Sequence, residues 1–128
     1  MFGLFDPFGR SAAVKALDHA LREAGLHPLL VPEAVKLTIL QLQKKDEAAR
    51  SMSRETANDE AALLLAYCML GRAQFIESND LAAAERVEQR FDGAIAAGDS
   101  LDAKIILLAV HSGLIAPEIA DRIDIEDR

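Results

Sequence analysis

The feature that most constrains the fold of this chain is a run of ten apolar residues, AALLLAYCML, at positions 61–70. The run is bounded on both sides: an Asn-Asp-Glu stretch at 58–60 precedes it, and Gly71 and Arg72 follow it. A helix that is apolar on every side has no face to present to water, so other helices must surround it. We therefore expect this segment to form the central helix of a helical bundle.

The composition favours the same architecture. Of the 128 residues, 51% are apolar, but only 5% are aromatic and none is Trp, so Leu, Ile, Val and Ala must supply the core. A core rich in Ala and Leu suits closely packed helices, and a chain of this length can bury it as one domain. We predict an all-α, compact single-domain bundle of five to six helices, with a hydrophobic central helix and an N-terminal aromatic arm.

Capping signals and helical periodicity divide the chain into segments. We expect an aromatic arm at 1–10, the helical bundle at 11–124 and a frayed C-terminus at 125–128. The central helix is predicted to run from Asp59 to Glu77. The polar stretch 43–59 has no clear apolar stripe, which fits either a loop or a solvated helical extension, and we predict a loop.

The net charge of −7 is unevenly distributed. Residues 10–54 hold eight Lys or Arg against five Asp or Glu, whereas residues 55–128 hold six against fifteen. Phosphate contacts dominate nucleic-acid affinity, and basic clusters are what bind anionic membranes. This acidic balance therefore predicts that neither nucleic acid nor a membrane is the partner.

Cysteine usage and the first residues indicate a location. Cys68 is the single cysteine, which excludes an internal disulfide and a Cys-rich zinc site. The segment 1–10 lacks the basic and apolar regions of a secretory signal, and the run at 61–70 is half of the ~20 residues that a membrane span needs. We expect a cytoplasmic protein.

One stretch has the spacing of a known helical hairpin. The matching positions are Tyr67, Leu70, Gly71, Ala83 and Val87. In this pattern the chain resembles a single repeat of the tetratricopeptide family, which implies a peptide-binding module. Gln74, Arg90 and Ile95 depart from the family's pattern, and no second copy follows. Since one such unit cannot bury its faces alone, we interpret the stretch as an ordinary helical hairpin and keep the peptide-binding module as an alternative.

Residues 108–122 resemble a helix-turn-helix motif, with Gly113 at the turn and Ile119 in the second helix. A recognition helix must approach phosphates, but this one would present Glu118 and Asp121 to them. We therefore predict a tight helical corner that closes the bundle.

The residues that could carry catalysis or bind a metal do not form a recognisable set. His19, His27 and His111 lie apart without metal-ligand spacing, and Cys68 lies where burial shields a thiol. Three carboxylates on one helix region are interpreted as a solvated face: Glu85, Glu88 and Asp92. We expect no metal, no cofactor and no catalysis. The alternative is a small-molecule binding protein or enzyme that uses an inter-helix cavity near His111.

The aromatic arm is the predicted interaction site. Its large apolar residues are Phe2, Leu4, Phe5 and Phe8. Each gains ~1.5–3 kcal/mol on full burial, so they must pack on the chain's own body, on a membrane surface, or in a groove of a second subunit or another protein. The arm holds three of the five phenylalanines, outside the helical core. We therefore predict a non-enzymatic role in protein–protein interaction, most simply as a homodimer.

Overall fold

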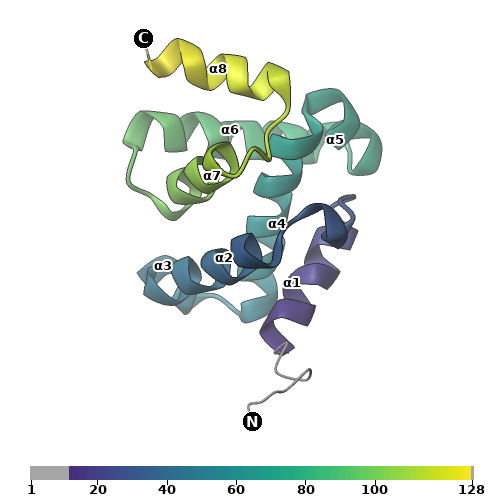
Figure 1. Ribbon diagram of the computed structural model, residues 1–128, viewed down its shortest axis with the longest axis vertical. Helices are drawn as coiled ribbons and strands as arrows, with labels where there is room; N and C mark the ends of the chain where they lie inside the picture. The colour runs from purple at the N-terminus through teal and green to yellow at the C-terminus, as the bar shows by residue number, and fades with distance from the viewer. Residues whose placement is uncertain (1–11, 128) are drawn as a thin grey trace.

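A computed structural model describes residues 12–127, and the side chains of residues 12–123 (Figure 1). Within this range all regular structure is helical. The elements are α1 (Ala12–Glu23), the 3-10 turn η2 (Pro28–Leu30), α2 (Glu33–Lys45), α3 (Glu47–Ser51), α4 (Arg54–Leu70), α5 (Arg72–Ser78), α6 (Leu81–Ala97), α7 (Leu101–His111) and α8 (Pro117–Asp127). The all-α prediction is confirmed.

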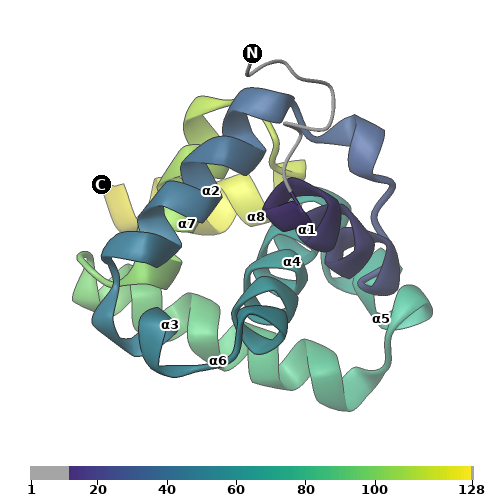
Figure 2. The same cartoon turned by 90° about the horizontal axis from the view of Figure 1, so that it is seen from below.

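Helix α4 lies at the centre of the molecule. It packs against α1, α3, α5, α6 and α7, and the view along its axis places it among them (Figure 2). Five consecutive side chains from Leu64 to Cys68 are at most 1% exposed. The apolar run therefore forms the central helix, as its lack of a polar face requires.

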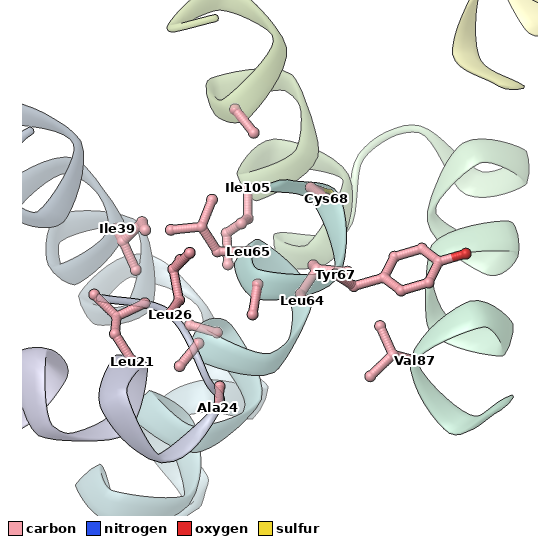
Figure 3. Close-up of a cluster of buried hydrophobic side chains, with 14 of the residues drawn as sticks. Leu21, Ala24, Leu26, Ile39, Leu64, Leu65, Tyr67, Cys68, Val87 and Ile105 are labelled. Atoms are coloured by element: carbon pink, nitrogen blue, oxygen red, sulfur yellow. The ribbon is translucent and has the colours of Figure 1, made fainter. Parts of the chain in front are cut away.

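The core lies mainly between α4 and the helices beside it. Leu21 and Leu26 from the α1 end, Ile39 from α2 and Ile105 from α7 gather against Leu65 of α4 (Figure 3). The Tyr67 ring points the other way, toward α6 (Figure 3). Both sides of α4 are thus covered.

The central helix is shorter at its C-terminal end than the sequence predicts. Gly71 has φ 84° and ends α4, so the expected helix at 59–77 is divided into α4 and α5. A Cβ on Gly71 would meet the Glu118 carboxylate at 2.5 Å. A glycine is required here for two reasons, because the backbone is left-handed and α8 approaches it closely.

The prediction of a loop at 43–59 is wrong. Helix α2 continues to Lys45, α3 follows, and α4 begins at Arg54. The Asp46 carboxylate caps α3 by accepting from the Ala49 N–H at 2.9 Å, and the Ser53 hydroxyl caps α4 by accepting from Thr56 at 3.1 Å. Together with the break at Gly71, these helices give eight α-helices in residues 12–127, where five or six were expected.

No helix in the described part of the chain is both long and apolar enough to span a membrane.

Candidate functional site

A cleft of about 500 Å³ opens among the N-terminal helices. Its lining comes from α1, α2, α3, the turn after α3, and the first turns of α4: Ala13, Leu37, Leu40, Gln41, Gln43, Lys44, Ala49, Arg50, Met52, Arg54 and Ala57. Ligand pockets in proteins commonly measure roughly 300–1,000 Å³, so the cleft can receive several side chains.

The cleft exists because α3 carries the chain from α2 across to α4. The Gln43 side-chain amide donates to the Ala57 carbonyl at 3.1 Å, and this bond joins α2 to α4 at the cleft. Ala49 is the buried residue of α3, and Met52 is partly buried beside it. Leu37 on the α2 wall remains 45% exposed. The cleft therefore offers apolar surface that nothing in residues 12–123 covers fully.

The charged groups of the cleft have one sign. Lys44, Arg50 and Arg54 line it, and none of the lining residues that the structure describes is acidic. None of the three forms a salt bridge with any residue from 12 to 123. On a chain of net charge −7, this places three cations without an ionic partner among residues 12–123 around one apolar hollow. The arrangement favours an apolar ligand that carries negative charge.

A second cleft of about 250 Å³ lies on the other side of α3, and it shares Ala49, Met52 and Ala57 with the first. The cation that lines this second cleft, Arg90, already has hydrogen-bond partners within the protein. Arg90 donates to both Asp102 oxygens at 3.0 and 3.1 Å and to the Glu60 carbonyl at 3.0 Å. A ligand would have to break these bonds, so the larger cleft is the better candidate.

The most polar cluster in the described residues lies between α4, α6 and α8. The buried Tyr67 hydroxyl donates to the Glu88 carboxylate at 2.8 Å and accepts from Arg122 at 2.6 Å. Arg72 also donates to Glu88, at 3.0 Å. Burial raises the pKa of Tyr67, and its hydrogen bond to Glu88 raises it further, so the phenol stays protonated.

Arg122 anchors α8 to the rest of the fold. Its guanidinium also donates to Asp92 at 2.5 Å and lies over the Phe91 ring, 4.7 Å from the centroid. The Tyr67 hydroxyl and both terminal nitrogens of Arg122 are hydrogen-bonded within the protein, and the Tyr67 side chain is fully buried. The cluster is therefore structural. The sequence interpretation of a solvated face holds for Glu85 and Asp92, which are exposed, although Asp92 also pairs with Arg122. It does not hold for Glu88, which is partly buried and bonded to Tyr67 and Arg72.

The structure separates the other candidate residues. His19 is exposed and lies 3.8 Å from Glu23, while His27 accepts from the Leu29 N–H at 3.1 Å. His111 is exposed at the end of α7, and neither cleft is lined by it. Burial raises the pKa of the Cys68 thiol to about 12. Within residues 12–123, no three His, Cys, Asp or Glu side chains come together as a metal site.

Two motif resemblances have different outcomes. Tyr67 and Gly71 close α4, while Val87 lies on the separate helix α6, so the expected two-helix hairpin is replaced by three helices. The tight corner predicted within 108–122 is confirmed: α7 ends at His111, and the Ala116 N–H donates to the Cys68 carbonyl at 2.7 Å. This bond ties the corner to the central helix.

The predicted arm residues Phe2, Leu4, Phe5 and Phe8 lie outside the described residues. The description begins at Ala12, and Ala13 is part of the cleft lining. Sequence reasoning did not find the cleft. The one available signal was the local excess of basic residues in 10–54, which includes all three cleft cations.

Comparison with known proteins found no family model, no curated protein and no solved structure that matches this chain.

Proposed function

We propose that this protein is a non-enzymatic, cytoplasmic interaction protein whose α1–α4 cleft binds an apolar segment of a protein partner that also carries negative charge. The observation that carries this proposal is the pairing of an uncovered apolar wall with three cations that have no ionic partner in residues 12–123. Such a pairing favours a ligand with both properties, because burial supplies affinity and charge supplies selectivity.

The chemistry of the lining supports binding rather than turnover. Among the lining residues that the structure describes, the polar side chains are Lys44, Arg50, Arg54 and two glutamines. Exposed guanidinium and ammonium groups hold anions well but are poor proton acceptors at neutral pH. A peptide carboxylate is a suitable counterpart. Nucleic acid is a poor one, because three cations on an acidic protein give little phosphate neutralisation.

A defined peptide pair tests this proposal. The probe is a fluorescein-labelled ten-residue peptide of Phe, Leu, Gly and Asp, and its control has Lys in place of each Asp. Fluorescence polarisation with the full chain should detect the acidic peptide and bind the basic one at least tenfold more weakly. Binding of the acidic peptide should also weaken as salt is raised, because the cleft charges are exposed.

Charge reversal in the cleft provides the matching variant. Arg50→Glu with Arg54→Glu should weaken binding of the acidic peptide at least tenfold, about 1.4 kcal/mol. Arg86→Glu is the control, since Arg86 is also exposed but lies on α6 away from the cleft. Equal binding of the acidic peptide by the cleft variant and the control would refute the proposal.

A further inference from the structure

Two buried carboxamide side chains lie at the α4 wall of the cleft, which Arg54 and Ala57 form. Among the residues from 12 to 123, the buried polar or charged side chains are Lys36, Gln43 and Asn58. Lys36 is paired with an aspartate at 2.8 Å. The Gln43 amide donates to the carbonyl of the peptide bond that links Ala57 to Asn58. Both carboxamide residues therefore belong to this wall.

The Asn58 side chain has hydrogen-bonding capacity that the fold does not use. The residue is 2% exposed, and neither its Oδ1 nor its Nδ2 has a hydrogen-bond partner among residues 12–123. An unsatisfied polar group that is buried costs free energy, and such groups are few in native proteins. Leucine has the same branching without this cost. Asparagine at position 58 therefore lowers the stability of the unbound protein.

Helix geometry directs the Asn58 amide toward the cleft. Side chains of an α-helix lean toward its N-terminus, and residues four apart lie on one face. Asn58 therefore leans over the turn that holds Arg54, which lines the cleft, as does the preceding residue Ala57. Because Ala57 is small, rotation of the Asn58 side chain can bring its amide to the cleft surface. Rotamer changes of this kind are common when a partner binds.

The free groups at this wall match the backbone of an extended chain. In an extended segment the N–H and C=O of one residue point to the same side, and a carboxamide offers the complementary acceptor and donor. Gln43 adds a further acceptor, because it lines the cleft and no residue from 12 to 123 donates to its Oε1. A helical segment would not fit, since a helix bonds its own central N–H and C=O groups.

We infer that the α4 wall of the cleft is a backbone-binding subsite, where the Asn58 amide hydrogen-bonds the N–H and C=O of one residue in an extended partner segment. The side chains of that segment supply the apolar and acidic groups, while its backbone fixes its position in the cleft. The inference rests on the proposed function, because it names the conformation in which the same cleft holds its partner.

Amide-to-ester substitution in the peptide tests this subsite with the full chain. An ester in place of one peptide bond removes the N–H donor there. The probes are the acidic Phe, Leu, Gly and Asp peptide and a series of versions that each carry one ester. Fluorescence polarisation should find one position at which the ester weakens binding at least tenfold. Asn58→Leu should bind the ester-free peptide at least tenfold more weakly, and the same ester should then weaken binding less than about threefold.

Urea denaturation of Asn58→Leu gives an independent readout. This variant should unfold at a higher urea concentration than the parent, because no buried amide is left unpaired. Asn58→Ala is smaller and should lose the ester effect in the same way, which covers the case in which leucine does not fit. Gln89→Leu is the matched control, since Gln89 is an exposed carboxamide on α6 that does not line the cleft, and it should keep both binding and the ester effect.

An ester series without a tenfold effect at any position would overturn the inference, as would an ester effect of equal size in the parent and in both Asn58 variants. If the acidic peptide still binds with the expected dependence on charge and salt, the proposed function stands and only the backbone-binding subsite is wrong. If the parent binds no acidic peptide at all, both are wrong.

Discussion

At the scale of single residues, two glycines with the same backbone conformation differ in how closely other atoms pack around them. Gly25 and Gly98 both follow helices, with φ 91° and 85°. A Cβ on Gly25 would lie 2.3 Å from the Ser78 Cβ, where α5 ends against α1, whereas a Cβ on Gly98 would meet nothing within 4 Å. Both positions thus have a positive φ, but only Gly25 lacks room for a side chain.

Alanine at these positions should therefore have unequal costs. Gly98→Ala should lower the free energy of unfolding by about 1–2 kcal/mol, the cost of a left-handed non-glycine residue. Gly25→Ala should cost at least ~1 kcal/mol more, because Ser78 and the α5 end must also move. Urea denaturation measures both. Equal losses would show that the contact between α1 and α5 is not tight.

The buried thiol makes stability depend on alkaline pH. The pKa of Cys68 is raised from 9.0 to about 12 in the fold, so between these values the unfolded chain loses the thiol proton while the folded chain keeps it. This contribution to stability is fully present below pH 9 and declines above it, by up to about 1.4 kcal/mol per pH unit. Comparing Cys68→Ala with the parent between pH 8 and 10.5 should reveal a shallower loss in the variant. Parallel curves would contradict the assigned burial.

At the scale of elements, α8 depends on one side chain for its polar attachment. Arg122→Met keeps an apolar stem over Phe91 but removes the bonds to Tyr67 and Asp92. We expect a loss of about 1–3 kcal/mol and faster amide hydrogen exchange in α8, because α8 then opens more readily. Arg86→Met serves as the control. Unchanged exchange in α8 would contradict the anchoring role of Arg122.

Helix positions were predictable where caps and apolar periodicity agree. Asp80 and Ser100 cap α6 and α7 by accepting N–H bonds at 2.7 and 3.1 Å, and Asp and Ser are among the residue types that favour this position. The helices around Asp46 and Ser53 were missed because little of that stretch is buried, which leaves almost no apolar period to read. Gly71 was missed because its close partner, Glu118, is distant in sequence.

The candidate site was less accessible to sequence reasoning than the fold. The cleft is lined by residues from Ala13 to Ala57 on four helices, and its shape depends on the Gln43 bond between two of them. Likewise Tyr67 and Arg122 are 55 residues apart. Contacts at such separations are set by packing, and a single sequence gives no spacing from which to infer them.

At the scale of the whole molecule, cooperative folding should depend on α4. Leu65 is 1% exposed in the core that α1, α2 and α7 share with α4. Leu65→Asp would bury an unpaired carboxylate, so we expect cooperative unfolding to disappear. Circular dichroism during thermal unfolding measures this directly. A variant that retains a cooperative transition would contradict the central position of α4.

The central claim is that the α1–α4 cleft binds an apolar segment that carries negative charge. Adding the acidic Phe, Leu, Gly and Asp peptide to ¹⁵N-labelled protein tests this claim residue by residue. We predict that amide resonances of Ala49 and Arg50 in the cleft shift strongly as the peptide is added, while those of Asp121 on α8 do not. Cleft resonances that do not shift would contradict the claim.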